Sequence, residues 1–245
     1  MSFNKVSILG VEFINTTMDE MVNKLLSHTA NKEKAFVVTA NPEIALYAYE
    51  NKNYRELLTK ADYVTADGIG VVKAAGLLGQ PLPERVTGFD MFMKLLEAAN
   101  EQSYSIYLYG AKDVVLEKTI ANIKKNYPNA KVVGSHHGYI DWENNCVADE
   151  IQKLKPDFVF LALGFPRQEQ WVAKNIDKFD SGVFMGVGGS FDVLAGVVNR
   201  APVVWQKLNV EWLYRLIQQP TRWRRMLALP IFMGKVLKQK VKGAK

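Results

Sequence analysis

An aspartate stands within an otherwise apolar stretch, "VTADGIGVV", at residues 64–72. Residues 62–66 have the pattern of a short strand, and a helical pattern begins at Ile69. Asp67 therefore has two interpretations. It is either the N-cap of the helix that follows, or a general base held at the rim of a pocket. Gly68 beside it would allow a bulky substrate to approach closely.

A second motif, "TANPE", occupies residues 39–43 after another predicted strand. Asn41 fits a helix N-cap, with Pro42 at the first helical position. Thr39 and Asn41 are also candidates for contacts to a ligand, because ligands of open parallel sheets bind beyond the carboxyl ends of the strands.

Two glycine-containing motifs follow later strands. In "LGFPRQEQW" (163–171), Gly164 precedes a predicted helix N-terminus, which favours phosphate. The alternative is a plain turn between a strand and an exposed polar helix. In "MGVGGSFD" (185–192), the backbone amides near Gly188 and Gly189 are candidates to cradle a diphosphate. This second motif is not G-x-G-x-x-G, so it is a poor dinucleotide fingerprint.

Several chemistries lack their sequence signatures. There is no zinc-ligand spacing, no G-x-S-x-G, no Walker lysine, and no D-x-D pair near the predicted strand ends. The single cysteine, Cys146, excludes an internal disulfide and fits a reducing compartment. The N-terminus is too polar for a signal peptide, and no apolar run reaches the length of a spanning helix.

The elements that would position these motifs are short apolar strands alternating with helical patterns. Such alternation predicts an α/β fold, a Rossmann-like parallel sheet flanked by helices on both faces. Residues 6–14 add a hairpin or an edge pair. The predicted strands are 35–39, 62–66, 105–110, 130–134, 157–164 and 182–188.

The C-terminal residues differ from the rest of the chain. Of 31 Lys and Arg and 25 Asp and Glu residues, 11 basic and one acidic residue fall in 200–245, which gives +10 there and −4 in 1–199. This asymmetry points to an anionic partner. We therefore expect an α/β core (1–199) and a basic, aromatic-rich helical appendage (200–245), formed by two helices.

Eight motifs, in this order and spacing, resemble the WecG/TagA/CpsF glycosyltransferase family, and the likeness covers residues 6–226. They are "TANPE", "ADGIGVV", "RVTGFD", "LYGAK", "LGFPRQEQW", "GVGGSFDVLAG", "NRAP" and "EWLYRLIQQPTRWRR". The branch most similar transfers N-acetylmannosamine in wall teichoic acid linkage-unit synthesis. The resemblance implies an inverting, metal-independent transfer from UDP-N-acetylmannosamine to N-acetylglucosamine-diphosphoundecaprenol. It also implies no cofactor, no nucleic acid, and a cytoplasmic enzyme at the inner membrane face.

The family's functional residues fall on positions of this chain that match its motifs. The resemblance implies catalytic roles for Asp67 as general base and for Arg85, Thr39 and Asn41. The implied substrate-binding residues are Gln168, Glu169, Arg215, Arg222, Arg224 and Arg225. Gly110, Gly164, Gly188 and Gly189, at the ends of predicted strands, are further candidates for substrate binding. Without a metal, arginines and helix N-termini must stabilise the departing diphosphate.

The C-terminal segment is expected to complete the active site and to dock on an anionic membrane surface. The expected apolar anchors are Trp205, Trp212, Trp223, Leu227, Ile231 and Phe232, and the expected headgroup contacts are Lys235, Lys238, Lys240, Lys242 and Lys245. Alternatively, these helices pack permanently on the core or form the interface of a homo-oligomer.

Other functions are also compatible with the sequence. One is a UDP-N-acetylmannosaminuronic acid transferase acting on the same type of lipid acceptor. Another is a nucleotide-binding dehydrogenase, which the glycine pattern disfavours. The third is a noncatalytic protein that binds nucleotide, nucleic acid or lipid through the basic tail, whose Trp and Leu content suits a membrane interface better than nucleic acid.

Overall fold

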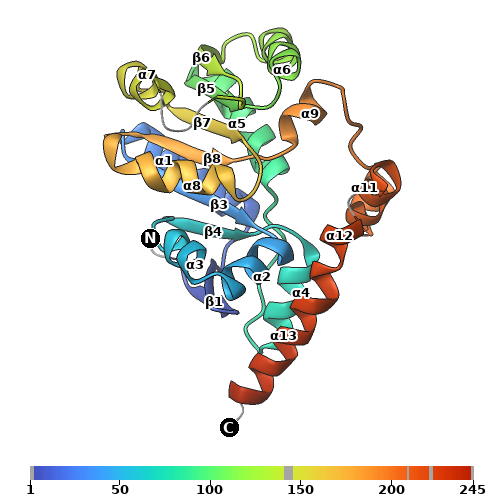
Figure 1. Cartoon of the computed structure of the whole chain (residues 1–245). Coiled ribbons are helices and arrows are strands. Elements are labelled where there is room, and N and C mark those ends of the chain that lie inside the picture. The colour runs from blue at the N-terminus through green and yellow to red at the C-terminus, as the bar shows by residue number, and fades with distance from the viewer. Residues whose placement is uncertain (1–2, 141–145, 209, 221–222, 244–245) are drawn as a thin grey trace.

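The structure is a computed structural model that describes residues 3–140, 146–208, 210–220 and 223–243 (Figure 1). Its centre is a six-stranded sheet, in which all the paired strands are parallel, with the order β4-β3-β8-β7-β5-β6. The strands are β3 (Lys34–Ala40), β4 (Tyr63–Ala66), β5 (Ser105–Gly110), β6 (Lys131–His136), β7 (Phe158–Ala162) and β8 (Gly182–Gly186). The predicted parallel α/β sheet is confirmed.

A separate antiparallel hairpin lies beside the β4 edge of the sheet. It consists of β1 (Lys5–Ile8) and β2 (Val11–Ile14), which confirms the hairpin predicted near the N-terminus. Strand β2 contacts β4, so the hairpin covers this edge of the sheet.

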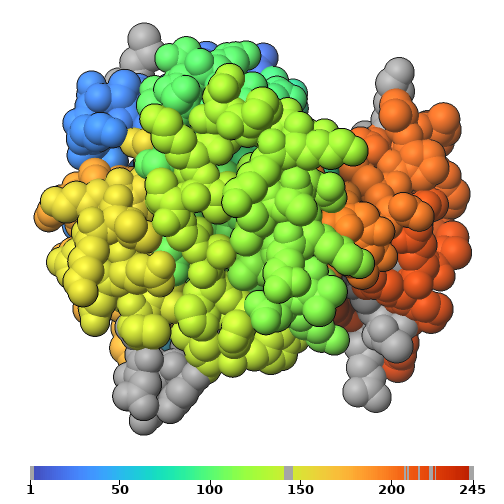
Figure 2. Space-filling model, turned by 90° about the horizontal axis from the view of Figure 1, so that it is seen from above, coloured from blue at the N-terminus to red at the C-terminus, as the bar shows by residue number. Residues whose placement is uncertain are grey.

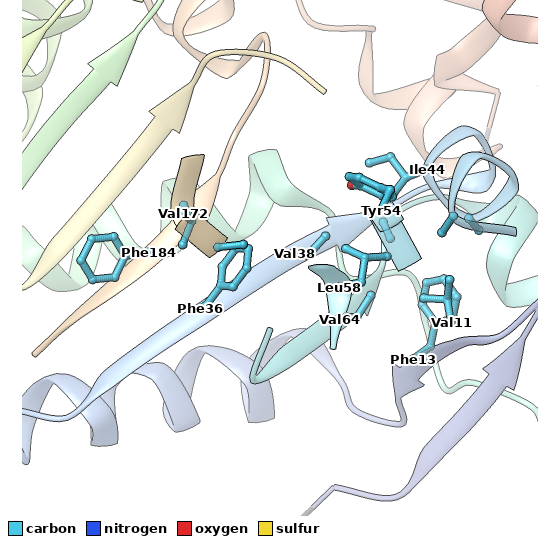
Figure 3. Close-up of a cluster of buried hydrophobic side chains, with 14 of the residues drawn as sticks. Val11, Phe13, Phe36, Val38, Ile44, Tyr54, Leu58, Val64, Val172 and Phe184 are labelled. Atoms are coloured by element: carbon cyan, nitrogen blue, oxygen red, sulfur yellow. The ribbon is translucent and has the colours of Figure 1, made fainter. Parts of the chain in front are cut away.

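Helices cover both faces, and each face has its own hydrophobic core. Along β3, Phe36 and Val38 belong to one core, whereas Ala35 and Val37 belong to the other. This alternation explains the continuous apolar strands, because successive side chains point to opposite faces and both faces are buried. Figure 3 shows part of the first core, where Phe36, Val38 and Phe184 of the sheet meet side chains from the hairpin and the helices.

The first core contains buried residues of α2 (Pro42–Glu50), α3 (Lys52–Leu58), α4 (Ile69–Leu77), α7 (Cys146–Leu154) and α8 (Arg167–Asn175). The second contains those of α1 (Met18–Ala30), α5 (Gly88–Gln102), α6 (Asp113–Asn126) and α9 (Ser190–Leu194). A single turn of 3-10 helix, Ile176–Lys178, follows α8. Figure 2 shows residues of α6 and β6 in green across one end of the molecule, with the orange and red C-terminal residues at its side.

The C-terminal segment forms α10 (Val203–Lys207), α11 (Glu211–Gln218), α12 (Trp223–Met226) and α13 (Ala228–Gly243). The prediction of two helices is therefore wrong in detail. Pro230 explains one of the breaks, because its ring nitrogen cannot donate to the carbonyl of Met226. Within the described ranges, no helix is both long and apolar enough to cross a membrane.

Helix α13 packs against α2 and α4 (Figure 1). Phe232 and Val236 are fully buried in the first core, and Gln239 accepts a hydrogen bond from the Leu9 amide and donates one to the Ser7 carbonyl. Phe232 was expected among the interfacial anchors, and that expectation is wrong, because this side chain lies on the face of α13 turned to the core.

Candidate active site

The carboxyl ends of β3 and β4 bring together Thr39, Asp67 and the first turn of α5. Thr39 pairs with Thr65 in the sheet register, which sets both strand ends at the same level. A Cβ atom on Gly88 would lie 2.7 Å from Oγ1 of Thr39, so the Thr39 hydroxyl lies directly against the start of α5. A larger residue at position 88 would have to displace this hydroxyl.

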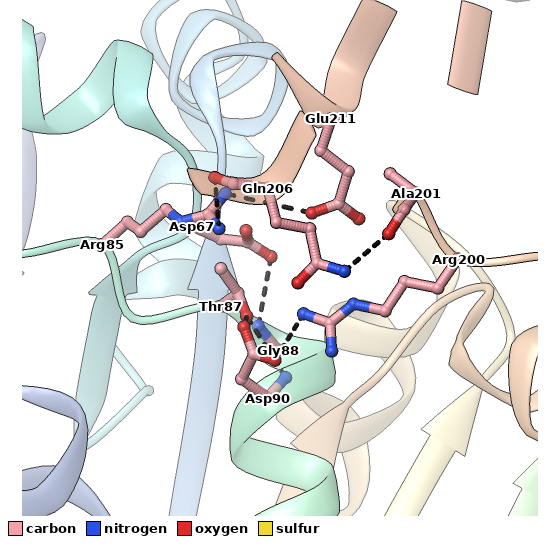
Figure 4. Close-up of polar contacts among 9 residues, drawn as sticks. All are labelled: Asp67, Arg85, Thr87, Gly88, Asp90, Arg200, Ala201, Gln206 and Glu211. Atoms are coloured by element: carbon pink, nitrogen blue, oxygen red, sulfur yellow. Dashed lines mark hydrogen bonds and ion pairs between the residues drawn. The ribbon is translucent and has the colours of Figure 1, made fainter. Parts of the chain in front are cut away.

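Asp67 lies at the centre of this arrangement (Figure 4). Its Oδ2 accepts a hydrogen bond of 3.2 Å from the amide of Gly88, the first residue of α5. Helix α4, which follows Asp67 in the chain, has Gly68 as its N-cap residue and no side-chain cap. The interpretation of Asp67 as the cap of the following helix is therefore wrong. Its carboxylate faces the N-terminus of a helix farther along the chain.

Arg85 connects this site to the C-terminal segment. Its Nη2 donates to the carbonyl of Gln206 in α10 at 3.3 Å, and its Nη1 lies 3.9 Å from Oε2 of Glu211 in α11. Figure 4 shows the guanidinium beside the Asp67 carboxylate. The fold therefore brings Asp67 and Arg85 together, and it places α10 and α11 against Arg85.

Asn41 caps a helix, as one of its two interpretations predicts. Its Oδ1 accepts from the amide of Ile44 at 3.0 Å, and Pro42 occupies the first turn of α2. This role commits the side-chain oxygen to the backbone. A ligand contact from the Asn41 amide nitrogen stays a prediction.

The side chain of Gln168 forms hydrogen bonds with residues that follow β7 and β8. Its Nε2 donates to Oε1 of Glu169 at 2.8 Å, and its Oε1 accepts from the amide of Gly188 at 3.2 Å. A Cβ atom on Gly186 would lie 2.3 Å from Nε2 of Gln168, so a larger residue at this strand end would displace the Gln168 side chain. The Gly188 amide, a candidate phosphate donor, is already bonded to a side chain.

Glu169 is 2% exposed, and its Oε2 has no hydrogen-bond partner within the part of the chain that the structure describes. Burial of this carboxyl group raises its pKa to about 7, and the hydrogen bond from Gln168 opposes that rise only in part. A carboxyl group with this pKa is charged or neutral depending on small changes near physiological pH.

The glycines predicted to bind substrate differ in what surrounds them in the structure. A Cβ atom on Gly110, whose φ is +128°, would lie 2.4 Å from the carbonyl carbon of Ala162, so close packing of β5 on β7 requires this glycine. Gly164 has φ of +76° and open space around its Cβ position. Gly189 precedes α9. Contacts of these three glycines with substrate stay predictions.

Of the C-terminal arginines, Arg225 has described contacts. It forms a bidentate ion pair with Glu43 in the first turn of α2, with Nη2 2.8 Å from Oε2 and Nε 2.9 Å from Oε1. Arg222 and the side chains of Arg215 and Arg224 lie outside the described residues. The approach of Arg225 to "TANPE" places one predicted phosphate-binding arginine near the end of β3.

Sequence reasoning did not assign roles to several residues of this site. Asp90, Arg200, Gln206 and Glu211 belong to the network in Figure 4, and Glu43 holds Arg225. The spacing Thr87-x-x-Asp90 is a helix-start signal that could have identified α5 as an element aimed at Asp67. The described residues include no group of three or more His, Cys, Asp or Glu that could hold a metal ion.

A carboxylate and an arginine lie at the carboxyl edge of a parallel sheet covered on both faces, which is where α/β proteins of this kind bind their ligands. The profile of the glycosyl transferase WecG/TagA/CpsF family matches residues 6–245. The chain belongs to this family and is a glycosyltransferase.

Two similar relatives are proteins of Staphylococcus aureus strains MW2 and NCTC 8325. Each is named N-acetylglucosaminyldiphosphoundecaprenol N-acetyl-beta-D-mannosaminyltransferase. Each is 44% identical to this chain, over an alignment that covers 98% of this chain and 96% of the relative.

Proposed function

We propose that this glycosyltransferase moves N-acetylmannosamine from its UDP donor to N-acetylglucosamine-diphosphoundecaprenol, as a step of wall teichoic acid linkage-unit synthesis. The observation that carries the acceptor and the sugar is the 44% identity, over nearly the whole chain, to relatives whose names state this transfer. The placement of Asp67 and Arg85 at the sheet edge supports the same chemistry.

The reaction is an inverting displacement. A hydroxyl of the acceptor sugar attacks the anomeric carbon of the donor, the bond from that carbon to the diphosphate oxygen breaks, and UDP departs. The hydroxyl proton passes to the Asp67 carboxylate, which acts as general base. The Gly88 amide holds that carboxylate in place, and Thr39 and Asn41 are proposed to orient the sugars beside it.

The departing diphosphate requires positive charge. Arg85 and Arg225 supply part of it, since guanidinium groups bind phosphate oxygens in a bidentate manner. Arg215, Arg222 and Arg224 are proposed to complete this set. The amides near Gly164 and Gly189, together with Gln168, are proposed to contact the donor at the ends of β7 and β8.

We also propose a functional division at residue 199. The core binds the donor, and residues 200–245 close the site and lie on the anionic inner face of the membrane. Exposed apolar side chains on this segment support the proposal, and its exposed lysines suit lipid headgroups. The apolar set includes Trp212, Ile217, Trp223, Leu227, Ile231, Leu237 and Val241.

The test of the function is an assay of purified protein with UDP-N-acetylmannosamine, UDP-N-acetylmannosaminuronic acid and UDP-N-acetylglucosamine. The acceptor is an N-acetylglucosamine-diphospho-lipid, and the product is read by mass and by anomeric configuration. Preferred transfer from UDP-N-acetylmannosamine with inversion is expected. Preference for the uronic acid donor would favour the alternative branch, and absence of transfer from all three donors would contradict the proposal.

Turnover is expected to be independent of divalent metal, because arginines supply the charge that a metal would otherwise provide. Saturating EDTA should leave the rate nearly unchanged. The matched control is a metal-dependent glycosyltransferase in the same buffer, which must lose activity. Loss of transfer that magnesium or manganese restores would show that a metal takes part.

The exposed apolar residues of α13 are expected to carry membrane binding. Leu237 and Val241 are 50% and 65% exposed, and replacing both by serine leaves Phe232 and Val236 in the core. Binding to anionic vesicles should fall by roughly 10-fold or more, since each buried aliphatic side chain contributes about 1.5 kcal/mol or more. Val114→Ser on α6, at a position 62% exposed, is the control. Equal binding by the double variant would indicate that this face serves another purpose, such as a subunit interface.

A further inference from the structure

The segment between α9 and α10 is tied to α5 through Arg200. Residues 199–202 have no helix or strand of their own. Nη2 of Arg200 lies 2.5 Å from Oδ1 of Asp90, and its guanidinium lies over the ring of Phe89, 4.4 Å from the centroid. Both partners are in the first turn of α5, so this contact fixes the point at which the chain leaves the core for the C-terminal segment.

The same carboxylate also holds the start of α5. Oδ2 of Asp90 accepts a hydrogen bond of 2.6 Å from the hydroxyl of Thr87, and that hydroxyl accepts from the Asp90 amide. The next residue after Thr87, Gly88, donates its amide to Asp67. Asp90 therefore connects Arg200 to the helix turn that holds the proposed general base.

A second path leads from Arg200 to Arg85 (Figure 4). The carbonyl of Ala201, a buried residue, accepts a hydrogen bond of 2.6 Å from Nε2 of Gln206. The carbonyl of Gln206 in turn accepts from Arg85. Arg200 is thus linked, through its neighbour Ala201 and through Gln206, to the arginine beside Asp67.

We propose that Asp90 and Arg200 are a positioning pair, which fixes the C-terminal segment on α5 and thereby holds Asp67 and Arg85 in their relative places for transfer. The proposed mechanism gives neither residue a contact with the reacting atoms. The roles of Asp67 and Arg85 in transfer rest on the proposed function. The pair itself rests on the contacts that Arg200 and Asp90 make with α5 and with each other.

The pair is expected to affect turnover more than global stability. The two side chains are 26% and 33% exposed, and partly exposed ion pairs contribute little to unfolding. A small displacement of groups that must be aligned with a substrate lowers the rate strongly. Lysine in place of arginine would keep the charge but lose the planar group that lies over Phe89.

The test compares Arg200→Gln, Arg200→Lys, Asp90→Asn and the double variant Asp90→Asn with Arg200→Gln. Asparagine at position 90 keeps an oxygen for the Thr87 hydroxyl. We expect Arg200→Gln and Asp90→Asn to lower kcat by roughly 10-fold with the donor KM within about 2-fold. Arg200→Lys should recover part of this loss. The double variant should have a kcat no lower than that of either single variant, because the two single substitutions remove the same Arg200–Asp90 contact.

Two further readouts separate positioning from unfolding. The thermal midpoint should stay within about 2 °C of the parent, while amide hydrogen exchange in 201–218 should become faster and exchange in β3 and β4 should not. Asp19→Asn is the matched control, because it breaks an ion pair with Lys94, which also lies on α5. It should change none of these quantities.

Parent-like kcat in Arg200→Gln would overturn the proposal, as would unchanged exchange in 201–218. The exchange measurement needs no substrate. It therefore still tests whether Arg200 and Asp90 fix the C-terminal segment on α5, even if the parent fails to transfer any of the sugars. If Arg200→Gln does not fold, Arg200→Lys and Asp90→Asn give the same two readouts, and an unchanged result in both would likewise reject the positioning pair.

Discussion

Asp67→Asn is expected to lower turnover by roughly 10² or more while the protein stays folded. The asparagine oxygen can still accept the hydrogen bond from the Gly88 amide, so the contact that Asp67 makes with α5 is retained. An amide cannot take the proton of the acceptor hydroxyl. The measurement is kcat with UDP-N-acetylmannosamine and the lipid acceptor, together with the thermal midpoint.

Asp113→Asn provides the matched control for this variant. Asp113 also follows a parallel strand and lies in the first turn of a helix, but it is exposed and belongs to α6. Its replacement should leave turnover unchanged. Near-normal turnover in Asp67→Asn would reduce Asp67 to a structural acceptor for α5 and would remove the general base from the proposed mechanism.

Glu169→Gln is expected to flatten the dependence of stability on pH. The pKa of Glu169 is raised from its ordinary value of 4.5 to about 7, chiefly because the carboxyl group is buried. Between these two values the folded chain holds a proton that the unfolded chain releases. The free energy of unfolding therefore falls as pH rises from about 4.5 to about 7, by about 3 kcal/mol in total at most, and stays low above that range.

Glutamine is neutral at every pH and keeps an oxygen to accept from Nε2 of Gln168. Urea unfolding measured from pH 5 to pH 8 should show this loss of stability in the parent and a smaller one in Glu169→Gln. Glu117→Gln, at an exposed position of α6, should behave as the parent. An identical slope in the parent and in Glu169→Gln would mean that Glu169 does not hold its proton in this range.

Much of the fold was predictable from local pattern. The apolar runs that alternate with helical patterns predicted all six strands of the parallel sheet, and the hairpin at the N-terminus was expected. Asn41 with Pro42 marked the start of α2 correctly. These features depend on alternation, on capping chemistry and on proline, which act over a few neighbouring residues.

The C-terminal segment was harder to predict, because its sequence is amphipathic in a way that fits both a membrane and a protein core. Phe232 and Ile231 are adjacent apolar residues, yet the first is fully buried and the second is exposed. Which of the two side chains is buried depends on how α13 is rotated about its axis against α2 and α4. That rotation is fixed by close contacts such as the one between the Gly70 position and Leu229.

The sequence by itself determined that the chain is an α/β protein. It also located the polar residues at the strand ends and the basic residues of the C-terminal segment along the chain. Its motifs also pointed to the glycosyltransferase family that the comparison confirms. Only the tertiary structure decided which of these residues meet. Asp67 faces α5 rather than the helix that follows it, and Arg85 contacts residues more than 120 positions away. Such contacts depend on the packing of separate elements, which no local pattern encodes.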